Sequence, residues 1–147
     1  MSEALNPSPA TGGHAPSRRT HLTVRGLEIA LALFFGIASA APKLVAHSSA
    51  VESFDTIGFG DWFMYLIGAL ELAGAVALLI PLLSGVAAIA FVGLMIGVFV
   101  TQLTAFDGEN LLTPVILAVP LVFMAVVRRP RTAELVGLVR RRTGAAH

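Results

Sequence analysis

The sequence predicts an all-α membrane protein: a bundle of four transmembrane helices, with a short amphipathic helix at the membrane interface between the first and second. Of the 147 residues, 56% are hydrophobic and only 13% are charged, whereas a soluble domain carries about 25% charged residues. Residues 72–106 contain no charged residue at all. Such a chain has too little polar surface to cover a water-soluble globule, so its natural solvent is lipid.

The residue types exclude several kinds of chemistry. The chain has no cysteine, which rules out disulfides, thiol nucleophiles and cysteine-ligated metals. The four histidines lie in the tails or alone in a loop, so no metal site is expected. The arginines gather near the two ends of the chain, and nucleic-acid binding is not expected either. Any redox chemistry would therefore need electrons carried by another molecule.

The apolar pattern divides the chain into a tail, a membrane domain and a second tail. Residues 1–21, rich in Pro, Ser, Gly and Ala, are predicted to be disordered. The membrane domain covers residues 22–127, and a basic C-terminal tail covers residues 128–147. About 20 residues of α-helix cross a hydrocarbon core of about 30 Å. The predicted spans are residues 22–41, 62–83, 85–103 and 111–127.

Proline, glycine and charged residues mark the ends of these spans. Pro42 is expected to end the first span, and the break between the second and third falls at residues 81–85. Ser49 and Glu52 fit a capping box, which predicts a short amphipathic helix over residues 49–57 at the outer interface.

The basic residues predict the orientation. Nine of the ten Lys and Arg lie at the two ends of the membrane domain, three of them up to Arg25 and six from Arg128 onward, and only Lys43 falls on the other side. The positive-inside rule places those nine in the cytoplasm, so we expect both termini to be cytoplasmic and the number of spans to be even. Arg25 and Glu28 are expected to reach the cytoplasmic face from the first turns of the first span.

An export signal is the alternative interpretation of the first span. Arg18 and Arg19 precede an apolar stretch that ends in Ala38-Ser39-Ala40, which resembles a twin-arginine signal with a small-residue cleavage site. Cleavage after Ala40 would leave three spans in the same orientation, so the charges do not decide between the two. Glu28 interrupts the apolar stretch, and this favours an uncleaved span.

Glu71 is the most informative residue of the sequence. It lies nine residues into the second span, where an ionised carboxylate costs about 2.5 kcal/mol or more. Two roles are open: a proton or ligand site, or a neutral carboxyl group hydrogen-bonded to a neighbouring helix, which we favour. Lys43 follows Pro42 and is expected to anchor the helix at the interface rather than to pair with Glu71.

A polar patch near the outer end of the third span completes the candidate ligand or proton site. Thr101 and Gln102 lie there, and such side chains usually form hydrogen bonds between helices.

Three glycines predict close helix packing. Gly93 and Gly97 lie four residues apart in the third span, and Gly68 lies in the second. Small residues at this spacing let another helix approach closely. That helix belongs either to this chain or to a second copy in a homo-oligomer.

The chain resembles the DoxX family of small bacterial membrane proteins over residues 24–127. The matching stretches are residues 41–44 (APKL), 67–74 (IGALELAG) and 78–81 (LLIP), of which the second follows the family pattern Ile-Gly-x-x-Glu-Leu-x-Gly. The chain departs from the family at Ser84-Gly85, where relatives often carry an arginine.

The resemblance implies a four-helix membrane bundle and says little about activity. Some members are similar to a subunit of a thiosulfate:quinone oxidoreductase, and others associate with redox-defence enzymes. We therefore expect a non-catalytic membrane component or assembly partner of a redox or stress system, with no cofactor of its own. The alternatives are a quinone-linked membrane subunit and, less favoured, a small-molecule transporter.

Overall fold

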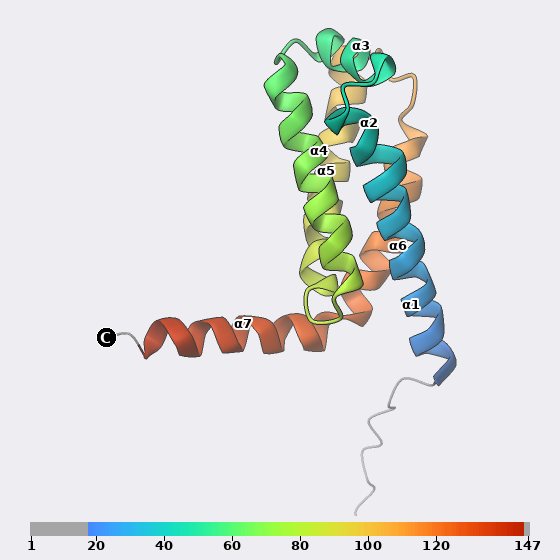
Figure 1. Cartoon of the computed structure of the whole chain (residues 1–147). Helices are drawn as coiled ribbons and strands as arrows, with labels where there is room; N and C mark the ends of the chain where they lie inside the picture. The colour runs from blue at the N-terminus through green and yellow to red at the C-terminus, as the bar shows by residue number, and fades with distance from the viewer. Residues whose placement is uncertain (1–17, 146–147) are drawn as a thin grey trace, which may run out of the picture.

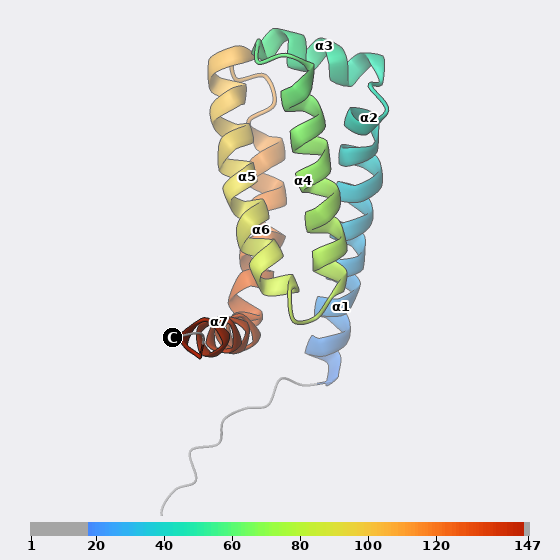
Figure 2. The same cartoon turned by 60° about the vertical axis from the view of Figure 1, so that its left-hand side comes forward.

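Residues 18–145, which the computed structural model describes, form helices joined by short turns and contain no strand. Four helical rods lie side by side; a short helix crosses one end, and the last helix leaves the other end (Figures 1 and 2). We call these the α3 end and the α7 end. The elements are α1 (Arg18–Leu33), η1 (Phe34–Ala40), α2 (Ala41–Leu44), α3 (Ser48–Ile57), α4 (Asp61–Leu79), α5 (Ser84–Ala105), α6 (Leu112–Val127) and α7 (Arg129–Gly144).

Within residues 18–145, three helical segments are long and apolar enough to cross a membrane. They are Arg18–Leu44, Asp61–Leu79 and Ser84–Ala105. A fourth candidate exists if α6 and α7, which are bent by 64° at their junction, count as one span. With 16 residues, α6 alone is about 24 Å long, less than the hydrocarbon thickness of about 30 Å.

The first rod is longer than the sequence predicts. It begins at Arg18, four residues before the predicted start, and the rest of the predicted disordered tail, residues 1–17, lies outside the described residues. The expectation that Pro42 ends the rod is wrong, because helix continues to Leu44. A π-helix, η1, directly precedes α2. Its wider turn accommodates the proline ring, which would clash with the carbonyl four residues earlier in a regular α-helix.

The α3 helix begins at a different cap from the predicted one. His47 is the N-cap, and its Nδ1 accepts a hydrogen bond from the Ser49 N–H at 3.4 Å. The predicted cap, Ser49, already lies inside the helix, because only His47 has the extended backbone that a cap requires. Gly58 ends the helix at φ +82°, a left-handed conformation that favours glycine.

An apolar core fills the middle of the bundle. The rings of Phe35 and Phe91 stack with their centroids 4.0 Å apart, and Leu78, Leu121 and Met124 are fully buried in the same cluster. Aliphatic side chains cover much of the outer faces of α4, α5 and α6 and are exposed. A helix that is apolar on both its inner and outer faces is typical of a membrane bundle.

A buried ionic cluster ties the rods together near the α7 end. The Glu28 side chain is fully buried and accepts a hydrogen bond from Arg128 Nε at 2.9 Å, and Arg128 Nη2 lies 2.7 Å from the same carboxylate oxygen. Arg25 Nη1 lies 3.1 Å from the same carboxylate and donates to the Leu79 carbonyl at 2.8 Å. The expectation that Glu28 reaches the membrane face is therefore wrong, because guanidinium groups from α1 and the α6–α7 junction meet it inside the bundle.

Removing the buried carboxylate tests this cluster. Glu28→Leu leaves the nearly buried Arg128 guanidinium without its counterion, which costs about 3–5 kcal/mol of unfolding free energy. We expect a large fall in the unfolding midpoint in detergent, and partial recovery in the double variant Glu28→Leu/Arg128→Met.

The matched control is Glu134→Gln, which changes an exposed acid on α7 that forms no ion pair within residues 18–145. Its midpoint should stay at the wild-type value. A Glu28→Leu protein as stable as wild type would contradict the assignment of the cluster to stability.

Candidate functional site

A pocket of about 430 Å³ lies inside the α3 end of the bundle. Its walls come from η1, α2, α3, α4, α5 and α6. Pockets of about 300–1,000 Å³ hold small-molecule ligands. Most of its lining is apolar, and the polar or charged lining residues are Ser39, Lys43, Ser53, Glu71, Thr101, Gln102, Asn110 and Thr113.

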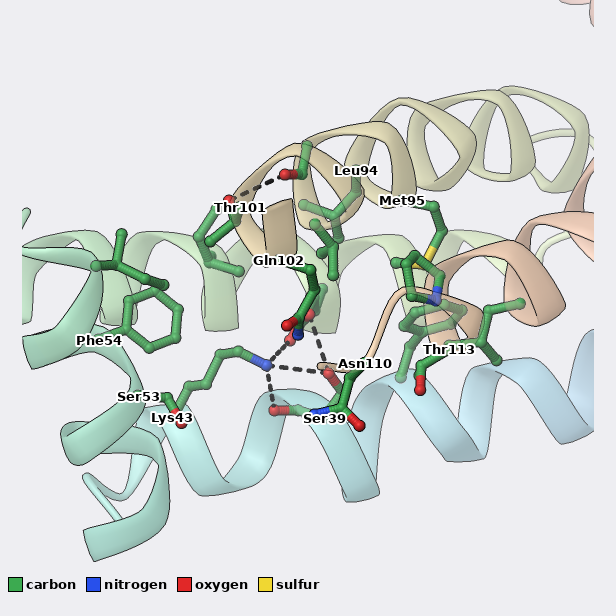
Figure 3. A pocket seen from close by; sticks show the side chains of 18 of the residues that line it. Ser39, Lys43, Ser53, Phe54, Leu94, Met95, Thr101, Gln102, Asn110 and Thr113 are labelled. Carbon is green, nitrogen blue, oxygen red and sulfur yellow. Dashed lines mark hydrogen bonds and ion pairs between the residues drawn. The ribbon is translucent and has the colours of Figure 1, made fainter. Parts of the chain in front are cut away.

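A hydrogen-bonded ion pair forms the polar wall of the pocket (Figure 3). Lys43 Nζ lies 2.8 Å from Glu71 Oε2 and donates to the carbonyl and the hydroxyl of Ser39 at 2.9 and 3.0 Å. The Ser39 hydroxyl donates to Glu71 Oε1 at 3.0 Å. The three donors of the ammonium group thus have three acceptors, and both carboxylate oxygens accept.

Close contact between two helices sets the geometry of this pair. A Cβ atom added to Gly68 on α4 would lie 3.0 Å from Lys43 Cβ and 3.2 Å from Leu44 Cγ. Only glycine lets α2 approach α4 so closely, one helical turn before Glu71. On the other side, Ser39 and Lys43 are four residues apart on the continuous rod, so their side chains lie on one face.

The ion pair corrects the sequence interpretation of Lys43 and Glu71. The sequence interpretation favours an interface anchor at Lys43 and a neutral carboxyl group at Glu71, because Lys43 follows Pro42 near the outer interface and would have to reach down most of its own length. Since the helix continues, Lys43 faces α4 instead. Phe54 of α3 is buried beside it and lines the same pocket. Only 16% of the Lys43 side chain and 4% of the Glu71 side chain remain exposed.

Thr101 and Gln102 line the opposite part of the same pocket. The Thr101 hydroxyl donates to the Gly97 carbonyl of its own helix at 2.9 Å. The Gln102 Oε1 atom is buried and has no hydrogen-bond partner within residues 18–145. The structure thus brings all four candidate site residues, Glu71, Lys43, Gln102 and Thr101, around one cavity.

The glycines of α5 have a different environment from Gly68. A Cβ atom added to Gly93 or Gly97 would have no atom of the described chain within 4 Å, so no helix of residues 18–145 packs against either. Gly97 lines the pocket and Gly93 does not. The predicted packing of a helix of this chain at these two positions is therefore not found among residues 18–145.

Sequence reasoning missed Ser39 and the aromatic lining from η1 and α3. Ser39 was treated only as part of a cleavage site, yet its spacing to Lys43 was the available signal for a shared helix face. The contribution of Phe34, Phe35 and Phe54 depends on how the rods meet, and the sequence contains no comparable signal for it.

A double-mutant cycle tests the ion pair. Glu71→Gln leaves the Lys43 ammonium group without its counterion, and Lys43→Met does the same to the carboxylate, so each should cost about 3 kcal/mol of unfolding free energy. The double variant should recover much of that loss. The measurement is the unfolding midpoint in detergent, with the exposed acid Glu109→Gln as control; strictly additive losses would contradict the pairing.

Comparison with known proteins assigns this chain to a protein family. The model of the DoxX-like family matches residues 26–124, a region that contains every residue lining the pocket and excludes α7. No curated protein and no solved structure gives a significant match. Because the match covers most of the chain and agrees with the resemblance noted in the sequence, this protein is a member of the DoxX-like family.

Proposed function

We propose that the chain crosses the bacterial inner membrane four times, with both termini in the cytoplasm. Three helices meet the length and hydropathy that a span requires, and α6 lies beside them as the fourth rod (Figure 2). The exposed residues of α6 are largely apolar, among them Val119, Val122 and Phe123. A short span is accommodated by local thinning of the bilayer.

The two helices outside the rods fit the two membrane surfaces. Helix α7 turns away from the rods (Figure 1) and carries exposed arginines together with exposed Val136, Leu138 and Val139. Basic residues near an anionic leaflet gain about 1 kcal/mol each, which supports a place on the cytoplasmic surface. Helix α3 crosses the other end and fits the opposite interface.

The first rod is proposed to stay attached to the rest of the chain. Ala40 is fully buried inside a continuous helix, where a signal peptidase has no access to an extended peptide bond. Glu28 of the same rod pairs with Arg128, so cleavage would also remove the counterion of that arginine.

Topology reporters test the four-span arrangement. Fusions at Ser49 and Gly108 should report an external location, and fusions at both termini an internal one. An external C-terminal fusion would contradict the arrangement, and a mature protein that begins at Ala41 would show that the first rod is removed.

For the activity, we propose a non-catalytic membrane component that holds a small, mainly apolar ligand for a redox or stress-response system. The observation that carries this proposal is the pocket of about 430 Å³ with its ion pair on one wall. Pockets of this kind, apolar with a few convergent polar groups, are the default sites for small ligands. Family membership supports a membrane role but does not supply a reaction.

A quinone-linked oxidoreductase subunit is the second candidate. The hydrogen-bonded set of Ser39, Lys43 and Glu71 favours it, because a carboxylate beside an apolar pocket can take up a proton from water and pass it to the oxygen of a bound quinone as the quinone is reduced. The electrons would come from a partner enzyme. The chain itself would bind the quinone and orient it.

The interior of the bundle supports a transporter less well than the two roles above. Between the ion pair near the α3 end and the Glu28 cluster near the α7 end lies the apolar core around Phe35, Phe91 and Leu121. A transport path needs polar groups along its length, and this layer interrupts it.

Analysis of bound molecules tests the proposed role. Protein purified in mild detergent should yield a small apolar molecule on solvent extraction, and a redox enzyme should co-purify after crosslinking. Quinone in equal amount to the protein would favour the second candidate. Gly97→Leu adds a side chain whose Cβ atom meets open space at the pocket and should lose the molecule, while Gly93→Leu, equally open at Cβ but outside the pocket, should keep it. Equal loss or equal retention in both variants would contradict the proposal.

A further inference from the structure

We propose that the pocket selects a neutral aromatic ligand that donates a hydrogen bond, such as a phenol, and that Gln102 recognises its hydroxyl group. This inference rests on the proposed ligand-holding role and adds the chemical class of the ligand. It follows from three properties of the lining: its charge, its hydrogen-bond inventory and its aromatic content.

The charges of the lining sum to zero. Lys43 and Glu71 are the charged residues among those that line the pocket, and their opposite charges lie 2.8 Å apart. A charged ligand would bring an unpaired charge into a mainly apolar cavity, which is costly. A neutral ligand leaves the ion pair intact.

The hydrogen-bond inventory leaves one buried acceptor. The Lys43 donors are used on Ser39 and Glu71, and the Ser39 hydroxyl donates to Glu71. The Thr101 hydroxyl donates within its own helix. Gln102 Oε1 is buried without a partner inside the described chain, and an unsatisfied buried acceptor costs free energy. Gln102 lines the pocket, so a rotation of its terminal amide group toward the cavity would let a ligand O–H group satisfy this oxygen.

The position of Gln102 suits this role. Its side chain points from α5 toward Lys43 and Ser39 across the pocket (Figure 3). A hydroxyl group bound to Gln102 therefore lies on the polar side of the cavity, and the rest of the ligand extends over its apolar surface. Asn110 and Thr113 also line the pocket but are exposed, so water can satisfy them.

The apolar surface is rich in phenylalanine. Five phenylalanines line the pocket, from η1, α3, α4 and the end of α5: Phe34, Phe35, Phe54, Phe63 and Phe106. Aromatic rings pack favourably against one another in edge-to-face or offset arrangements. A ring with a short alkyl chain is accordingly favoured over an aliphatic chain of similar size.

The experiment compares 4-pentylphenol with its methyl ether, 4-pentylanisole, which keeps the ring and chain but lacks the donor. The full chain in detergent is titrated with each probe, and the unfolding midpoint is measured. We expect a saturable rise with the phenol, at a half-saturating concentration about tenfold lower than with the ether, as one buried hydrogen bond predicts. 1-Decanol, the aliphatic probe, should bind more weakly than the phenol.

Variants at three positions test whether the probes bind in the pocket and whether Gln102 recognises the hydroxyl group. Gln102→Leu should bind phenol and ether equally, and Gln102→Met serves the same purpose if the leucine variant fails to fold. Gly97→Leu should lose the response to both probes. Gly93→Leu, the control outside the pocket, should retain the wild-type preference.

The outcomes separate this inference from the proposed function. Equal responses to phenol and ether in the wild type, both lost in Gly97→Leu, would overturn recognition by Gln102 while leaving the pocket as a ligand site. A response to 1-decanol as strong as that to the phenol would overturn the aromatic preference. Responses unchanged by Gly97→Leu would overturn both the inference and the proposed site.

Discussion

Ionised side chains inside an apolar bundle must be paired, and the arrangement of this protein depends on that constraint. Glu28 and Glu71 are both buried, and each meets a cation from elsewhere in the chain: Arg128 lies a hundred residues away from Glu28, and Lys43 lies on the first rod opposite Glu71. Leaving a buried charge alone costs several kcal/mol, by general estimates about 3–5. Each pair therefore constrains which helices are neighbours.

The two ionic sites have different surroundings. We therefore assign a structural role to the Glu28 cluster and a candidate ligand-binding role to the Glu71 pair. The Glu28 cluster joins α1, the end of α4 and the junction of α6 and α7. The Glu71 pair borders a cavity instead. An ion pair beside a mainly apolar cavity is already satisfied, so it provides a polar wall that does not require a charged ligand.

Local backbone irregularity makes the second site possible. The π-helical segment η1 carries Ser39 and two of the pocket phenylalanines, and it lets the rod continue through Pro42 to Lys43. Single π turns in α-helices frequently occur at functional sites. Here the irregular segment, the close approach at Gly68 and the cover by α3 all serve the same end of the bundle.

The sequence by itself determined the helical membrane class, the family and the approximate limits of the helices, because apolar runs, prolines and charges report on local segments. It also singled out Glu71, Lys43, Thr101 and Gln102, since polar residues in apolar runs are conspicuous. Only the tertiary structure decided that Lys43 pairs with Glu71, that Glu28 is buried against Arg128 and that Gln102 has an unsatisfied oxygen. Those outcomes depend on which helices meet and at what depth, and contacts between residues far apart in the chain leave no periodicity in it.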